Sequence, residues 1–231
     1  MKKPIIGIIG KVQPQYGEDI WHRIDEVDEL RYLVVRNGGI AIILLPTEAT
    51  LKFNDNDIKD ETILTKEEKS ELYRQVDLCD GFILQGGLYS SNYEIEIAKR
   101  VIELDKPLIG ICAGFNNILR AIGSDVVEDK ARSHDKYDVN YRHKISIMKD
   151  TKLFDLMKKD EYEVNSIHTM IAPRNMVEPY AKISSLSYDG LVESFELHNK
   201  KFVVGVKWHP ELMLEDEFTG ELFREFIEEC K

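Results

Sequence analysis

A chain of 231 residues, 43% of them hydrophobic, is long enough to bury a sizeable core, and we expect a single domain over residues 1–231. Its 31 Lys and Arg residues against 42 Asp and Glu residues give a formal net charge of −11. Such a charge repels phosphate backbones and anionic lipid, and no apolar run approaches the ~20 residues of a membrane span. Neither nucleic acid nor a membrane is therefore expected as a partner.

In chain order, five continuous apolar runs without regular alternation predict strands that are buried on both faces. They are residues 5–9, 40–45, 82–84, 108–111 and 202–206. Helical patterns lie between them. Residues 23–37 place apolar side chains at steps of three and four and end at Asn37-Gly38-Gly39, a typical helix stop. Thr65 and Ser91, each followed three residues later by glutamate, indicate capping boxes that open two further helices.

The second half of the chain has shorter runs that alternate more strongly. Residues 143–148, 162–165, 182–187 and 192–197 predict antiparallel strands added to the same sheet. The alternation of strand and helix in the first half predicts a mainly parallel central sheet with helices on both faces, which is an α/β fold. The polar residues 52–60 are expected to form a surface loop.

The most informative segment is Lys106-Pro-Leu-Ile-Gly-Ile-Cys-Ala-Gly-Phe-Asn117, in which a buried strand turns directly into a helix. Cysteine stands between two glycines here, in the nucleophile-elbow pattern Gly-x-nucleophile-x-Gly. The tight turn strains its central residue, and only small neighbours leave room for it. The helix that begins at Ala113 points its N–H groups at the sulfur and so favours the thiolate. We therefore interpret Cys112 as a nucleophile, although a small buried core cysteine is the common alternative.

The other two cysteines have no such setting. Cys79 is expected to pack in the core and Cys230 to lie on a solvent-exposed tail. The three cysteines show no paired spacing, so no metal site and no cofactor are expected. Their small odd number suits a reducing, cytoplasmic compartment.

A cysteine nucleophile needs a base and a group that orients the base. Among six histidines, His209 follows a buried strand in Val203-Val-Gly-Val-Lys-Trp-His-Pro-Glu211, at the strand end where parallel sheets place their sites. In extended geometry Glu211 would project from the same face and hold one imidazole tautomer. The oxyanion needs donors as well. The N–H of Ala113 is one, and Gly86 or Gly87, after the strand at 82–84, would present the second.

Four segments together resemble class I glutamine amidotransferase-like domains, and in particular the γ-glutamyl-γ-aminobutyrate hydrolase branch of the C26 peptidase family. They are Gln85-Gly-Gly87, Gly110-Ile-Cys-Ala-Gly, Asn165-Ser-Ile-His168 and Trp208-His-Pro-Glu211. The resemblance covers nearly the whole chain and implies a three-layer, flavodoxin-like fold. It also implies a Cys112–His209–Glu211 triad that hydrolyses a γ-glutamyl amide through a thioester.

The same resemblance assigns the surrounding residues. Gly87 and Ala113 would form the oxyanion hole, and Gly86, Asn116 and His168 would meet the substrate. The sequence departs from the family pattern where Ala113 replaces the usual Arg and Asn116 the usual Gln. The usual Gly-Gly-x-Asp-x-x-Pro loop is shortened and lacks its Asp, and His-His-Gln becomes His168-Thr-Met. The chemistry is therefore expected to be kept while the leaving amine differs.

Three functions remain open at this level. The first is a stand-alone hydrolase that releases glutamate from a small-molecule γ-glutamyl conjugate. The expected absence of a synthetase domain favours it, since the chain ends 20 residues after Glu211. The second is a glutaminase subunit that feeds ammonia to a separate synthetase partner. The third is a non-catalytic binding protein on the same fold, against which the intact triad argues. A homodimer is compatible with all three.

Overall fold

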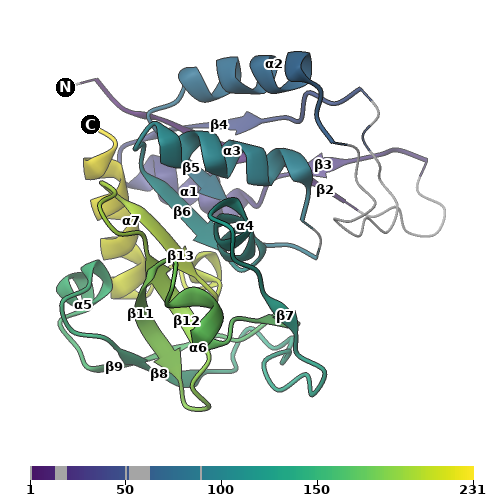
Figure 1. Cartoon of the computed structure of the whole chain (residues 1–231). Helices are drawn as coiled ribbons and strands as arrows, with labels where there is room; N and C mark the ends of the chain where they lie inside the picture. The colour runs from purple at the N-terminus through teal and green to yellow at the C-terminus, as the bar shows by residue number, and fades with distance from the viewer. Residues whose placement is uncertain (1, 14–19, 50, 52–62, 89) are drawn as a thin grey trace.

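The computed structural model describes residues 2–13, 20–49, 51, 63–88 and 90–231, so the expected surface loop at 52–60 lies outside the described residues. A nine-stranded sheet in the order β4-β1-β5-β6-β13-β12-β11-β8-β9 runs through the molecule (Figure 1). Two short pairs, β2 with β3 and β7 with β10, accompany it. The strands are β1 (Ile5–Ile9), β2 (Lys11–Val12), β3 (Ile24–Asp25), β4 (Ile40–Leu44), β5 (Gly81–Leu84), β6 (Leu108–Ile111), β7 (Val127–Glu128), β8 (His143–Ile147), β9 (Glu161–Val164), β10 (Met170–Ile171), β11 (Lys182–Ser187), β12 (Val192–Glu196) and β13 (Val203–Val206).

The two halves of the sheet differ in direction, as the sequence predicts. Strands β4, β1, β5, β6 and β13 pair in parallel, and β13, β12, β11, β8 and β9 pair antiparallel. The parallel half is joined by helical crossovers and the antiparallel half by short connections, which is the usual division between the two kinds of pairing. The predicted α/β class is confirmed.

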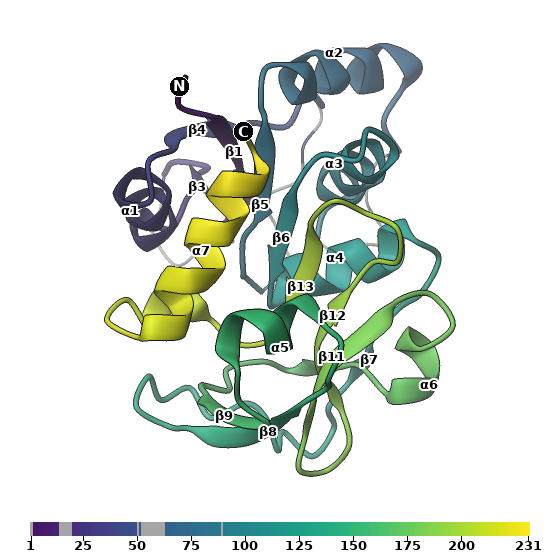
Figure 2. The same ribbon diagram turned by 90° about the vertical axis from the view of Figure 1, so that its left-hand side faces the viewer.

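Helices cover both faces of the sheet and make three layers (Figure 2). Helices α1 and α7 pack together on one face with α5 against α7, while α2, α3 and α4 pack in succession on the other. The helices are α1 (Asp28–Arg36), α2 (Lys66–Asp77), α3 (Asn92–Glu103), α4 (Ala113–Ala121), α5 (Lys152–Met157), α6 (Arg174–Val177) and α7 (Glu217–Glu229). No helix among the described residues is long and apolar enough to cross a membrane.

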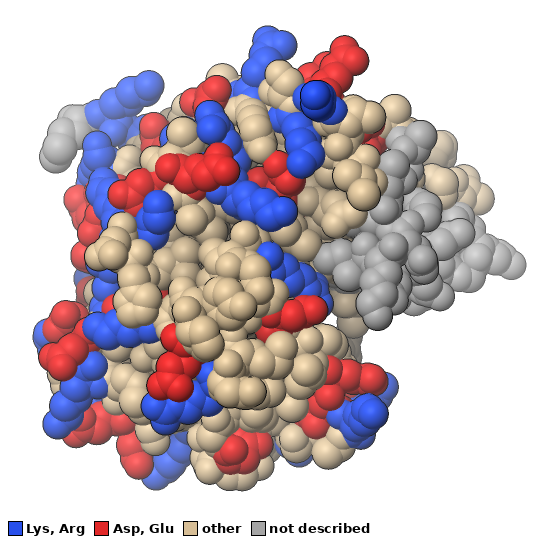
Figure 3. Space-filling view, viewed as in Figure 1, with Lys and Arg blue, Asp and Glu red and all other residues tan. Residues whose placement is uncertain are grey.

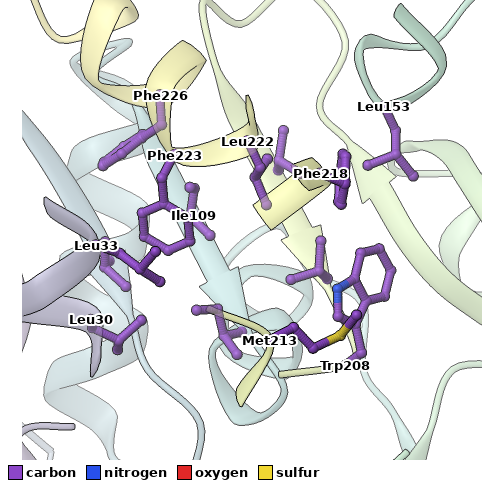
Figure 4. Packing of buried hydrophobic residues seen from close by; sticks show 14 of the residues in the cluster. Leu30, Leu33, Ile109, Leu153, Trp208, Met213, Phe218, Leu222, Phe223 and Phe226 are labelled. Carbon is purple, nitrogen blue, oxygen red and sulfur yellow. The ribbon is translucent and has the colours of Figure 1, made fainter. Parts of the chain in front are cut away.

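Alternate side chains of each central strand supply two separate cores. On β6, Ile109 and Ile111 join the core beneath α1 and α7, whereas Leu108 joins the core beneath α2, α3 and α4. Figure 4 shows the first core, where Phe223 and Phe226 of α7 lie near Leu33 of α1 and Ile109 of β6. Because both faces of these strands are covered, their sequences are continuously apolar.

The structure corrects the predicted first helix. Residues 24–25 form β3 rather than a helical turn, and α1 begins only at Asp28. The Gln85 side chain explains the difference: its amide donates to the carbonyls of Ile9 (2.8 Å) and Asp25 (2.9 Å), and its oxygen accepts from Val27 N (3.1 Å). These three bonds satisfy backbone groups of an extended segment, and sequence periodicity does not reveal them.

Two burial predictions are also wrong. Strand β4 is the edge of the sheet, so Ile40 and Ile43 are each more than 40% exposed instead of buried on both faces. Cys230 is buried, because the end of α7 places its sulfur directly over Gly81, where a Cβ would lie 2.2 Å from it. The remaining predicted strands and the helices opened by Thr65 and Ser91 are present, within one residue of the expected limits.

Charged side chains of both signs are interspersed on the face that Figure 3 shows, around a largely uncharged centre. The net charge of −11 therefore does not gather into one acidic patch on this face.

Two helical glycines provide a matched test of the packing. A Cβ on Gly114 of α4 would lie 2.0 Å from the backbone oxygen of Leu84, whereas a Cβ on Gly220 of α7 meets nothing within 4 Å. We expect Gly114→Ala to lower the free energy of unfolding by about 1–3 kcal/mol or more, because the β5 backbone cannot yield. Gly220→Ala should raise it by about 0.5–1 kcal/mol, since alanine favours a helix.

Urea denaturation followed by circular dichroism measures both changes. Equal effects of the two substitutions would contradict the close approach of α4 to β5.

Candidate active site

A strained cysteine stands at the junction of β6 and α4. Cys112 has φ 50° and ψ −99°, a conformation that residues with a side chain rarely adopt. A Cβ on Gly110 would lie 2.6 Å from the oxygen of Gly114, and Gly114 itself touches the backbone of Leu84. Both glycines are thus required by close backbone approach, as the sequence predicts for an elbow. Helix α4 begins at the next residue, so Cys112 lies at the positively polarised N-terminal end of this helix.

His209 and Glu211 form a tight pair beside this elbow. His209 Nδ1 lies 2.7 Å from Oε1 of Glu211, a carboxylate that is only 3% exposed. The sequence predicts this pair from extended backbone geometry. The backbone is instead a 3-10 turn over Pro210–Leu212, which His209 precedes. The turn folds Glu211 back under the imidazole and so brings the carboxylate within hydrogen-bonding distance.

The backbone of His209 is held by Asn165. The Asn165 amide donates to the His209 carbonyl (2.7 Å), and its oxygen accepts from His209 N (2.9 Å). Gly86 closes the other side, where a Cβ would lie 2.5 Å from His209 Cε1. The glycine predicted to meet the substrate therefore makes room for the imidazole.

The charges around the elbow shift the pKa values of Cys112 and His209. Burial by itself raises the pKa of the Cys112 thiol, but the positive charge of His209 and a hydrogen bond to it bring that pKa below its ordinary value. Burial lowers the pKa of His209, and the charges of Glu211 and Cys112 outweigh this and raise it well above its ordinary value. Both shifts favour the thiolate–imidazolium pair over the neutral thiol and imidazole.

Lys207 is a feature that the strand pattern missed. Its side chain is fully buried and donates to Asn116 Oδ1 at 2.5 Å. Desolvation lowers the pKa of Lys207 to about 8, against the opposing charges of Cys112 and Glu193. The sequence did offer a signal for this burial, because Lys207 stands between the apolar run and Trp208. A lysine is seldom fully buried unless it has a partner, so the position also indicates a partner. Asn116, predicted to meet the substrate, is thus oriented by this ammonium group.

A cavity of about 410 Å³ opens at the elbow. Most of the predicted site residues line it: Gly87, Cys112, Ala113, Asn116, His168 and His209. Gly86 and Glu211 are not among its lining residues, because they support His209 from behind. His168 is 5% exposed, and its Nδ1 lies 3.0 Å from the carbonyl of Met170, so only part of its ring faces the cavity.

Two side chains of opposite charge also line this cavity, and the sequence did not single them out. Arg120 on α4 donates to Ser90 Oγ (2.8 Å) and pairs with Asp125 (2.9 Å). Asp135 comes from a different part of the chain and forms a backbone bridge with Ile167. The cavity is therefore lined by a cation and an anion next to the thiol, each with a protein partner of opposite charge, since Asp135 lies 3.5 Å from Arg132.

Comparisons with known proteins agree with this architecture. The Peptidase C26 family model matches residues 90–211, more than half of the chain. A glutamine-hydrolyzing GMP synthase subunit of Archaeoglobus fulgidus is 30% identical over 160 residues, covering 68% of this chain and 79% of that protein. Gamma-glutamyl-gamma-aminobutyrate hydrolase PuuD of Escherichia coli K12 is 27% identical over 149 residues, 58% of each chain.

Among solved structures, a protein assigned as a GMP synthase subunit from Thermoplasma acidophilum superposes with a TM-score of 0.67 at 19% identity, over 100% of this chain and 95% of that one. At this identity the likeness shows the fold. Fold and relatives together define a protein of the class I glutamine amidotransferase-like superfamily. Within it, the chain belongs to the Peptidase C26 family, a family of amide-hydrolysing enzymes, as the sequence resemblance indicated.

The three thiols should differ sharply in reactivity. Burial raises the pKa of Cys79 to about 11 and raises that of Cys230 further, whereas the pKa of Cys112 is lowered. At neutral pH, iodoacetamide should therefore alkylate Cys112 first, because only thiolates react appreciably. The rate should fall only as the pH drops below the lowered pKa of Cys112.

Peptide mass spectrometry of the native protein across a pH series measures this order. The unfolded protein, in which all three thiols are alike, is the control. Modification of Cys79 before Cys112 would contradict the assigned electrostatics.

Proposed function

We propose that this protein is a cysteine hydrolase that cleaves a γ-glutamyl amide through a γ-glutamyl thioester and acts as one catalytic domain over residues 1–231. The observation that carries the proposal is the strained Cys112, held at the start of α4 beside the 2.7 Å His209–Glu211 pair. This arrangement provides a nucleophile, a proton carrier and a group that orients the carrier. The sparse, unpaired thiols suit the reducing cytoplasm.

In the first half of the reaction the Cys112 thiolate attacks the amide carbonyl, and the carbonyl electron pair moves to oxygen. The N–H groups of Ala113 and Gly87 stabilise that oxyanion. The tetrahedral intermediate collapses, the C–N bond breaks, and the His209 imidazolium gives its proton to the leaving amine. A thioester to Cys112 remains.

In the second half, neutral His209 accepts a proton from water as the water attacks the thioester. Collapse of this intermediate releases glutamate and returns the thiolate–imidazolium pair. Glu211 takes no part in the proton transfers and stabilises the imidazolium.

The two charges in the cavity support a γ-glutamyl group as the acyl part of the substrate. This group ends in an α-carboxylate and an α-ammonium, and each needs a charged partner once water is displaced. Arg120 matches the carboxylate and Asp135 the ammonium, and both line the cavity with Cys112. The neighbouring Asn116 is fixed by Lys207 and offers a polar group of constant orientation.

A second function is favoured by one relative. The Archaeoglobus fulgidus protein is the glutamine-hydrolyzing part of a GMP synthase, so this chain is also a candidate for a glutaminase that delivers ammonia to a separate synthetase. The same triad serves both reactions, and the two proposals differ in the leaving group and in the need for a partner. A homodimer is compatible with either.

A substrate screen tests the proposed activity. The purified protein should release glutamate from at least one γ-glutamyl amide other than glutamine, and Cys112→Ala should abolish that release while the protein stays folded. Cys79→Ala is the matched control and should keep its turnover, because its thiol is buried away from the cavity.

Glutamate release from glutamine alone, and only after cell extract is added, would favour the ammonia-delivering glutaminase. Full turnover by the Cys112→Ala protein would exclude the proposed nucleophile.

The charged pair in the cavity should govern substrate binding. Arg120→Ala and Asp135→Asn should each raise KM for the γ-glutamyl substrate on the order of 10-fold or more, as expected when a charged hydrogen bond is lost. Arg174→Ala on α6, an exposed arginine that does not line the cavity, is the control and should leave KM unchanged. Steady-state kinetics normalised to alkylatable Cys112 measures these effects. An unchanged KM in both cavity variants would move the acyl site elsewhere.

A further inference from the structure

Behind the wall of the cavity, three imidazoles surround one buried carboxylate. The carboxylate is Glu193 of β12, and the imidazoles are His134, His143 at the start of β8, and His168. All four residues are at most 7% exposed. They come from four separate segments of the chain, and the reaction proposed above uses neither Glu193 nor His134 nor His143.

One ring nitrogen of each imidazole lies near the same oxygen of Glu193. Glu193 Oε1 lies 3.5 Å from His134 Nδ1, 3.9 Å from His143 Nε2 and 3.7 Å from His168 Nε2. Single ligand atoms of His134, His143 and Glu193 all lie within 4.8 Å of one another. Bonds of about 2.0–2.2 Å in a tetrahedral site place neighbouring ligand atoms roughly 3.3–3.6 Å apart. His134, His143 and Glu193 therefore need only small side-chain shifts to meet that geometry, whereas His168 Nε2, which lies 3.7 Å from the same oxygen but outside this group, must move further to become the fourth ligand.

The outer partner of His134 fixes its tautomer. His134 Nε2 lies 3.0 Å from Asp189 Oδ2, and a carboxylate accepts, so Nε2 carries the hydrogen. The Ser166 hydroxyl, 3.4 Å from Nδ1, donates its hydrogen to the His134 carbonyl at 2.8 Å. In the neutral ring, the lone pair of His134 Nδ1 then faces Glu193.

His168 is oriented in the same way. Its Nδ1 lies 3.0 Å from the Met170 carbonyl, which can only accept, so in the neutral ring the lone pair of Nε2 also faces Glu193. Among the residues that the structure describes, none donates a hydrogen bond to either oxygen of Glu193. The ammonium of Lys207 is bonded instead to Asn116.

Two nitrogen lone pairs and a carboxylate that face one another in the protein interior repel, and burial without a donor is costly. A cation at their centre removes both penalties. Outer hydrogen bonds to a carboxylate and a backbone carbonyl are the usual way in which metal-bound imidazoles are held.

We propose that His134 Nδ1, His143 Nε2, His168 Nε2 and Glu193 Oε1 form a structural site for a divalent transition-metal ion of the Zn²⁺ class. Imidazole nitrogen with one carboxylate oxygen is a donor set that Zn²⁺ accepts, and four protein ligands leave no open position for catalysis. Asp189 and the Met170 carbonyl orient two of the imidazoles from outside.

The proposed metal site lies next to the cavity and would affect its wall. The metal would join β8 and β12 to the segments that carry His134 and His168. His168 lines the cavity, and the carbonyl of its neighbour Ile167 lies 3.9 Å from Cys112 Sγ. The ion would therefore fix the cavity wall opposite the elbow, without touching the reacting atoms.

The experiment is metal loading of the full-length protein. Protein dialysed against a chelator is titrated with Zn²⁺ in competition with a chromophoric chelator, and with Co²⁺ followed by visible absorption. We expect one metal ion per chain, the intense d–d bands of tetrahedral Co²⁺, and a higher Tm on Zn²⁺ addition. Glu193→Gln and His143→Gln should lose the site, and His198→Gln, an exposed histidine outside the cluster, should keep it.

Cys112→Ala distinguishes this site from metal bound at the elbow. Binding that survives Cys112→Ala and is lost in Glu193→Gln supports the proposal. Binding that is lost in Cys112→Ala and kept in Glu193→Gln, or no stoichiometric binding at all, overturns it.

If the buried variants do not fold, Asp189→Asn supplies the test, because Asp189 is partly exposed, accepts from Ser187 as well as pairing with His134, and is not itself a ligand. It should weaken Zn²⁺ binding by roughly 10- to 100-fold. An unchanged affinity in Asp189→Asn would likewise overturn the proposal.

Discussion

The parallel pairing of β6 with β13 is the constraint on which the site depends. Its register places Ile111 beside Val206, and the N–H of Cys112 donates to the Val206 carbonyl at 2.9 Å. The carboxyl ends of both strands lie at the same end of the sheet. The Cys112 thiol, which follows β6, and the His209 imidazole, which follows β13, therefore meet there. Parallel strands require long crossovers, which explains how residues almost 100 positions apart in sequence come together.

Burial gives this meeting point its chemistry. In water the charges of Cys112, His209 and Glu211 would interact weakly, but in the interior each strongly affects the others. Burial disfavours the charged form of both the thiol and the imidazole, but the opposite charges of the neighbouring groups shift both pKa values the other way, toward the charged forms. Lys207 adds a further positive charge that lowers the pKa of the thiol.

The antiparallel half of the sheet serves a different purpose from the parallel half. Its strands and connections carry the far wall of the cavity, including His168, and bring together the imidazoles around Glu193. These residues share no short motif, since they stand at positions 134, 143, 168 and 193. Two of them, His143 on β8 and Glu193 on β12, come close in space because β8 and β12 both pair with β11.

The sequence by itself determined the elements whose cause is local. The apolar runs predicted the central strands, the capping residues predicted α2 and α3, and the glycines around Cys112 predicted the elbow, because each leaves a local pattern in the sequence. The motif at residues 208–211 likewise predicted the meeting of His209 and Glu211, although through the wrong backbone geometry.

Tertiary structure decided everything that depends on distant partners. Gln85 replaced the predicted start of α1 by a strand, the edge position exposed β4, and the packing of α7 on Gly81 buried Cys230. The roles of Lys207, Arg120 and Asp135 also appeared only in three dimensions. A hydrogen bond or ion pair between residues tens of positions apart leaves no periodic trace in a single sequence, and so only the folded chain reveals it.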